Sequence, residues 1–151
     1  MIKKIIIVLF VFVLSTLSFS ATLNFKAGLR DLVGVKAGLE AGLGSKDNKR
    51  LFVEYGVYGV LFVEAGQYAA VKVGLDKDSD IRFGIEGVRT KIIFEKLFGI
   101  DDEDVDVINM AGPVIEYSPR NEHYFISAAY LKELDHSSVD GMLYVDVGFK
   151  F

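Results

Sequence analysis

The chain has 151 residues, the length of a single domain. It contains no Cys, which excludes a disulfide framework, a thiolate metal site and a cysteine nucleophile. A content of 51% hydrophobic and 25% charged residues excludes a disordered chain, and a formal net charge of -4 excludes the basic surface typical of a nucleic-acid binder. The sequence has no phosphate-binding loop, dinucleotide fingerprint or HExxH motif, so we expect neither a cofactor nor a catalytic metal.

Residues 1–20 predict a cleaved signal peptide. Two lysines precede the apolar run 5–14, and Ser18 and Ser20 supply the small residues of a cleavage site before Ala21. The alternative is a retained membrane anchor, but the run is about half the roughly 20 residues that a spanning helix needs. We therefore expect an exported protein whose mature domain is 21–151.

Apolar residues of the mature domain alternate with polar or small ones. The apolar set falls on odd positions and includes Leu23, Phe25, Leu29, Val35, Leu39, Val53, Val57, Val71, Val73, Phe83 and Ile85. A period of two is typical of strands with one apolar face, whereas a helix would need apolar residues three and four positions apart. The sequence therefore predicts an all-β domain.

Polar, turn-forming breaks divide this pattern into strands. We predict eight, with ten as the alternative: 22–30, 33–44, 50–58, 60–75, 81–92, 105–117, 122–133 and 142–151. Tight reversals are expected at 30–32 and 58–60. The stretch 88–104 has the least regular pattern and could continue a strand or form helical turns.

The even face is both charged and cramped. It holds eleven of the 15 glycines, and glycine weakens a strand unless something must approach closely. Its charges nearly cancel: Lys26, Arg30, Lys36, Glu40, Glu54, Glu64, Lys72, Arg82, Glu86, Asp146 and Lys150. A narrow lumen filled by paired charges explains both features.

The odd face is then the outer one, and its aliphatic surface exceeds what a soluble monomer exposes. Lipid permits such a surface, and closure satisfies the backbone groups that a bilayer leaves without water. The sequence thus predicts an antiparallel up-and-down transmembrane β-barrel. Eight strands leave an interior that side chains fill, which disfavours the alternative of a small channel.

The final segment alternates through Leu143, Val145, Val147, Phe149 and Phe151. It resembles the terminal recognition strand of bacterial outer-membrane barrels, and with the signal peptide the chain is similar to small eight-stranded proteins of the OmpA transmembrane-domain or OmpX type. The resemblance implies the cell outer membrane as location, membrane lipids as neighbours, insertion by the barrel assembly machinery, and a monomer with a non-enzymatic structural or surface-interaction role. The alternative is an edge strand of a soluble periplasmic sandwich.

A second resemblance offers an enzymatic alternative. His136 and Ser138 are similar to the His-x-Ser pair of outer-membrane lipid A deacylases, which implies Ser138 as nucleophile and His136 as general base. The pattern departs from that family because Val139 stands where it has Asn and no Glu follows His136, so Asp140 or Asp146 would have to act as the orienting acid.

Two further features suggest ligands only weakly. The carboxylates of Asp101–Asp104 could bind a cation, but they lack the spacing of an EF-hand loop, so we expect a solvated acidic loop. His123 follows a predicted turn and has no second ligand at metal spacing, which favours an interfacial polar residue.

Overall fold

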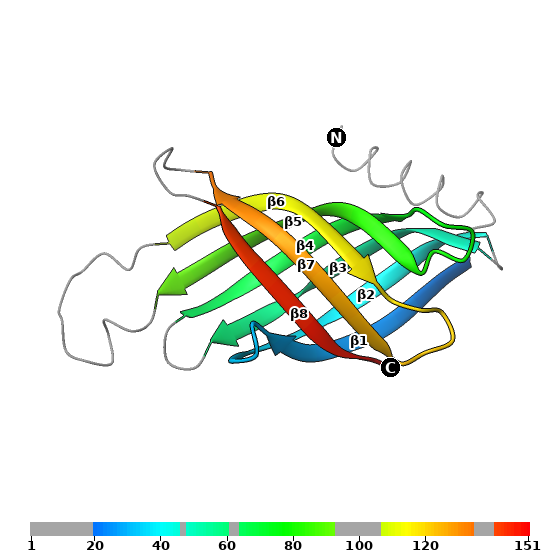
Figure 1. The fold of residues 1–151 in the computed structure, drawn as a ribbon, viewed down its shortest axis with the longest axis horizontal. Helices are drawn as coiled ribbons and strands as arrows, with labels where there is room; N and C mark the ends of the chain where they lie inside the picture. The colour runs from blue at the N-terminus through cyan, green and yellow to red at the C-terminus, as the bar shows by residue number, and fades with distance from the viewer. Residues whose placement is uncertain (1–19, 46–47, 61–63, 93–106, 135–140) are drawn as a thin grey trace, which may run out of the picture.

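The computed structural model describes residues 20–45, 48–60, 64–92, 107–134 and 141–151. Eight antiparallel strands each pair with the next, and β8 pairs with β1 to close a barrel (Figure 1). The strands are β1 Ser20–Arg30, β2 Gly34–Ser45, β3 Asn48–Val60, β4 Glu64–Gly74, β5 Ile81–Ile92, β6 Val107–Tyr117, β7 Tyr124–Glu133 and β8 Met142–Lys150. The predicted all-β, eight-stranded antiparallel barrel is confirmed.

The barrel has two ends. We call the end with the chain termini the terminal end and the opposite end the loop end. β1 begins and β8 finishes at the terminal end, where turns also join β2 to β3, β4 to β5 and β6 to β7 (Figure 1). The other four connections lie at the loop end. None of the described segments forms a helix with the length and apolarity to cross a membrane.

The seam between β1 and β8 is secured at both ends. Near the terminal end, Phe25 and Phe151 exchange two backbone hydrogen bonds of 2.9 and 2.8 Å. At the loop end, the Asp31 amide donates to the Val145 carbonyl at 2.8 Å, and an Asp31 carboxylate oxygen accepts from the Val145 amide at 2.7 Å. Asp31 and Leu32 adopt left-handed φ angles of 52° and 64° in this turn.

One predicted reversal is wrong. The ladder between β3 and β4 continues through Gly59↔Ala65 and Val60↔Glu64, so the chain does not reverse at 58–60 and β4 begins later than predicted. Both strands stay in register to this point because a three-residue connection keeps residues i and i+4 opposite each other, as Arg30↔Gly34 also does. The connecting residues 61–63 and the acidic segment Asp101–Asp104 lie outside the described residues.

The predicted inward direction of even-numbered side chains is observed in seven strands, and β7 is the exception. There the buried side chains are the odd ones, including Phe125, Ser127 and Leu131. Tyr117 pairs with Ile126, so an odd-numbered residue lies opposite an even-numbered one. Paired residues point to the same face, and the even-numbered side chains of β7 therefore point outward. The connection to β8, where Leu131 pairs with Met142, switches this direction back.

The register also determines the tilt of the strands. Following paired residues from Ala21 leads through Leu43, Leu51, Val73, Phe83, Ile115, Ala128 and Val145. Val145 lies opposite Asp31, ten positions beyond the start. With a rise of about 3.3 Å per residue and strands about 4.8 Å apart, this shear tilts the strands by about 40°.

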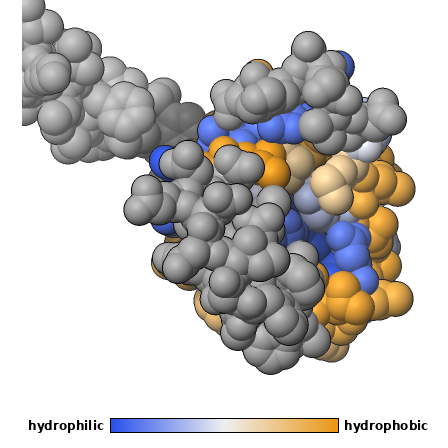
Figure 2. Space-filling view, turned by 90° about the vertical axis from the view of Figure 1, so that its left-hand side faces the viewer, coloured by the Kyte–Doolittle hydropathy of each residue, from blue (hydrophilic) through white to orange (hydrophobic). Residues whose placement is uncertain are grey.

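The outer face is apolar and exposed, as the barrel interpretation requires. Leu39 and Val73 are 53% and 48% exposed and are not buried against a second sheet. Figure 2 looks from the loop end and shows hydrophobic residues along the outer wall and hydrophilic residues within. The odd positions therefore face outward in every described strand except β7.

Inward glycines make room for aromatic rings. Gly38 and Gly56 are paired between β2 and β3, and a Cβ added to either would contact the Tyr68 side chain. At Gly38 it would also lie 2.8 Å from the backbone oxygen of Tyr55. Tyr68, which is buried, thus occupies the space that these two positions leave.

We predict that Gly38→Leu lowers the free energy of unfolding by about 1–3 kcal/mol, because the lumen has no room for the added side chain. The matched control is Ala37→Leu, since the neighbouring residue points outward. Equilibrium denaturation of the refolded barrel measures both variants. Equal stability of the two would contradict the assignment of Gly38 to a filled interior.

Candidate functional site: the charged lumen

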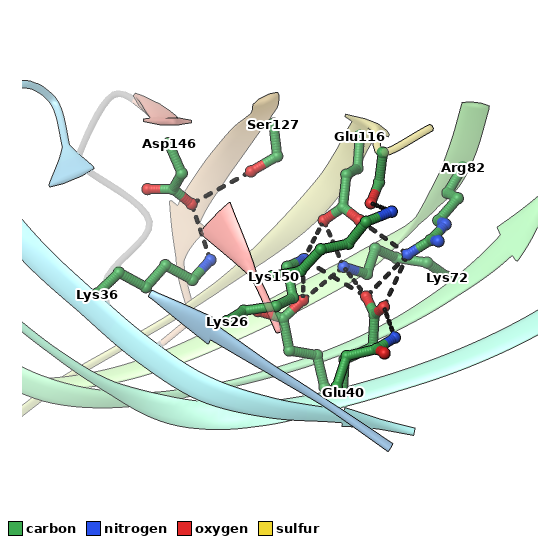
Figure 3. Close-up of polar contacts among 12 residues, drawn as sticks. Lys26, Lys36, Glu40, Lys72, Arg82, Glu116, Ser127, Asp146 and Lys150 are labelled. Atoms are coloured by element: carbon green, nitrogen blue, oxygen red, sulfur yellow. Dashed lines mark hydrogen bonds and ion pairs between the residues drawn. The ribbon is translucent and has the colours of Figure 1, made fainter. Parts of the chain in front are cut away.

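The largest group of polar side chains inside the barrel is an ion cluster of six residues. Each of the first six strands contributes one member, and together they supply three cations and three carboxylates: Lys26, Glu40, Glu54, Lys72, Arg82 and Glu116. All six are buried. They meet at one height because each tilted strand is displaced along its neighbour. Figure 3 shows the side chains of Lys26, Glu40, Lys72, Arg82 and Glu116 turned toward one another.

Glu116 illustrates how completely this six-residue cluster is paired. One of its oxygens accepts from Lys26 at 2.7 Å and from Lys72 at 2.6 Å, and the other accepts from Arg82 at 3.0 Å. Arg82 also donates to both oxygens of Glu40, at 2.8 and 2.9 Å. Such charge-assisted bonds compensate for the loss of hydration that burial imposes.

A second ion cluster of four residues lies nearer the loop end. Arg30 Nε donates to Asp146 at 2.8 Å and its Nη2 donates to Glu86, while Lys36 Nζ bridges the same two carboxylates at 2.7 and 3.2 Å. Ser127 Oγ adds a hydrogen bond to Asp146 at 3.3 Å. Through Asp146 and Ser127, the interactions reach β8 and β7 as well.

Tyr68 links the two ion clusters. Its hydroxyl donates to Glu54 at 2.8 Å, and Lys36 Nζ lies 3.9 Å from the centre of its ring. Tyr58 and Tyr144 hold the guanidinium of Arg30 with ring centroids 4.8 Å away. Ring faces attract cations, so these aromatic side chains extend the electrostatic network.

Apolar side chains pack beyond the four-residue ion cluster. Tyr58, Tyr68 and Tyr144 belong to a buried group that also contains Val88, Met110, Val114, Ala129 and Leu131. At the terminal end, by contrast, the lumen opens into a pocket of about 440 Å³ whose lining includes Phe52, Arg82, His123 and Lys150. The interior is thus open to this pocket at one end and filled with side chains further in.

The structure brings nine of the eleven side chains predicted for the lumen into the two ion clusters. Lys150 is buried but donates to Ser118 Oγ at 3.0 Å and to the Pro119 carbonyl at 2.5 Å. Glu64 lies half-buried at the start of β4, outside both ion clusters. Sequence reasoning missed Glu116, although its even position in the predicted strand 105–117 was the available signal.

The oxygens of Glu40, Glu54 and Glu116 lie within 4.8 Å of one another, a spacing that could suit a metal ion. The ammonium groups of Lys26 and Lys72 already contact all three carboxylates. A divalent cation would have to replace these positive charges, so this carboxylate set fits lysine and arginine better than a metal.

The enzymatic alternative gains no support from the described residues. His136 and Ser138 lie outside them. Asp146, the proposed orienting acid, is occupied by Arg30 and Lys36 inside the lumen. His123 Nδ1 lies 3.3 Å from the Lys150 carbonyl oxygen, so its ring contacts the backbone at the end of β8.

The fold and its interior define a class of protein: a closed eight-stranded antiparallel barrel with an apolar exterior and a lumen filled by balanced charges. Across the two ion clusters, five cations face five carboxylates. No family model, curated protein or solved structure matches this chain.

We predict that Glu116→Gln lowers the free energy of unfolding by about 3–5 kcal/mol, since it leaves a buried positive charge without its counter-charge. Adding Lys26→Met restores neutrality and should recover at least about 1 kcal/mol. Denaturant titration of the single and double variants measures the difference. Exposed Glu122→Gln is the control, and a double variant no more stable than Glu116→Gln would refute charge balance as the cause.

Proposed function

We propose that the chain is an outer-membrane barrel with a sealed lumen and a non-enzymatic role, structural or in interactions at the cell surface. The observation that carries this proposal is the separation of the two faces. The ion-paired side chains turn inward, whereas exposed outward residues in the middle of the strands are aliphatic or aromatic, among them Val53, Val71, Ile85, Ile115 and Val147. Water does not favour such a surface, but hydrocarbon does.

The dimensions of the barrel support insertion in a bilayer. Strands of 9 to 13 residues, tilted by about 40°, rise roughly 22–32 Å along the barrel axis. The apolar band of a membrane barrel is about 25 Å tall. Each described strand also pairs with a neighbour on both sides, so the barrel has no edge strand exposed to lipid.

Aromatic residues near the terminal end are a further support. Phe25 and Phe151 stack with ring centroids 6.5 Å apart, and Tyr117 and Tyr124 lie 6.2 Å apart. These four rings belong to β1, β6 and the ends of β7 and β8, and all are exposed on the outer wall. Girdles of aromatic side chains are typical of the membrane–water interface.

The packed interior favours a structural or surface-interaction role over the small channel considered from the sequence. Ions would have to pass two ion clusters and the apolar group that contains Leu131 and Tyr144. The OmpA or OmpX resemblance, the signal peptide and the terminal assembly strand remain sequence predictions that agree with this role. They place the termini in the periplasm and the loop end at the cell surface.

Localisation and activity test the proposal directly. After cell fractionation, the mature chain should be in the outer membrane, and the unheated protein should migrate faster on gels than the boiled one. Planar-bilayer recordings should show no stepwise current, and wild type and Ser138→Ala should release the same background level of product from lipid A. A soluble periplasmic chain would refute membrane insertion, and serine-dependent product release would establish the hydrolase instead.

We predict that Val71→Arg lowers the free energy of unfolding in a bilayer by about 2–4 kcal/mol, because Val71 lies mid-strand on the outer face. Gln67→Arg lies on the same face of β4, four residues closer to the loop end, and should cost about 0–1 kcal/mol. Denaturant unfolding from lipid vesicles measures both variants. If Val71→Arg is as stable as Gln67→Arg, lipid does not contact the outer face.

A further inference from the structure

At the loop ends of β4 to β7, the charged side chains at outward-facing described positions are all basic. Arg89 and Lys91 on β5 and Lys132 on β7 are exposed at outward-facing positions. On the same four strands, the carboxylates Glu64 and Glu133 belong to inward-facing positions, and Glu133 pairs with the buried Met110. Asp31 lies on the β1–β2 turn, where its carboxylate accepts from the Val145 amide. This edge of the barrel therefore presents a positive patch, which we call the basic rim.

A polar row runs across three neighbouring strands. Gln67, Arg89 and Asn109 are register partners on β4, β5 and β6. Gln67 also accepts a hydrogen bond of 2.9 Å from the hydroxyl of Tyr55 on β3. On β4, β5 and β6, the outward-facing charged and amide side chains lie in this row or between it and the loop end. The row therefore marks where the apolar wall ends.

A groove lies directly below this row. Ala69, Gly87 and Ala111, the next outward register partners, form its floor, and Tyr55 and Leu134 are among its walls. Its volume is about 320 Å³. A Cβ added at Gly87 would meet only a backbone oxygen 3.9 Å away, so the floor is open to the outside.

We propose that this face binds a membrane lipid whose headgroup carries phosphate. The basic rim of Arg89, Lys91 and Lys132 contacts the phosphate, and the groove over Ala69 and Gly87 accommodates part of an acyl chain. The inference rests on the proposed function, because it needs the loop end to lie at the lipid interface.

The chemistry of the rim suits such a ligand. Lysine and arginine can lay their methylene stems along an apolar wall and extend the charged head to the headgroup level. Arginine can donate two parallel hydrogen bonds to one phosphate. Basic side chains next to a small apolar groove therefore complement a molecule that is anionic at one end and hydrocarbon at the other.

Native mass spectrometry of the refolded full chain in a neutral sugar detergent tests the proposal. The probe is phosphatidic acid, compared with diacylglycerol of the same acyl chains. Wild type should retain phosphatidic acid preferentially. The triple variant Arg89→Gln, Lys91→Gln, Lys132→Gln should bind it about a hundredfold more weakly, because each basic group contributes roughly fivefold. Inorganic phosphate in large excess should not displace the lipid.

A matched triple variant removes the same charge at the opposite end: Lys49→Gln, Arg50→Gln and Lys77→Gln. It should bind phosphatidic acid as wild type does. The proposal would be overturned if wild type and the rim variant bound phosphatidic acid equally, or if both triple variants lost binding to the same extent. It would also be overturned if wild type retained diacylglycerol as well as phosphatidic acid, or if inorganic phosphate displaced the lipid. Heat-modifiable migration is measured on the same samples, so failure to form a detergent-soluble barrel refutes the proposed function separately from the lipid site.

Discussion

Mutual neutralisation of buried charges is the constraint on which this barrel depends. The six-residue ion cluster takes one side chain from each of β1 to β6, and the four-residue ion cluster adds Asp146 of β8, to which Ser127 of β7 donates. All eight strands therefore contribute side chains to the polar interior, in which Tyr68 links the two ion clusters. Because an unpaired buried charge costs several kcal/mol, a shift of one strand past its neighbour would leave charges without partners. The pairing thus favours this register over others.

Because side chains fill the interior, the outer wall is the surface on which differences between strands can affect binding. Side chains that neutralise one another inside the lumen are not free for a substrate, and the aromatic and apolar group beyond Arg30 closes the path toward the loop end. What distinguishes one part of the outer wall from another is the position of its few polar residues. Gln67, Arg89, Asn109 and Lys132 lie on this wall at the loop ends of β4 to β7, and this placement links the proposed membrane role to the proposed lipid site.

Much of the architecture followed from the alternation of residue types. A period of two reports side-chain direction residue by residue, so the strands and the exposed aliphatic face were predictable without coordinates. The failures occurred where a connection determined the outcome. The parity switch in β7 depends on the number of residues between Tyr117 and Ile126, and the late start of β4 depends on a ladder that continues to Val60 and Glu64. Local composition predicts neither the register after a connection nor the point at which a ladder ends.

The sequence by itself therefore determined the fold class and the chemical character of each face and favoured eight strands over ten, because these depend on the pattern of neighbouring residues. Only the tertiary structure decided which charges meet. Lys26, Lys72 and Glu116 are far apart in the chain and occupy different positions along their strands, and a shear of ten residues brings them to one height. The physical reason is that ion pairing acts through space, and the distances across a barrel are determined by the register of all its strands together.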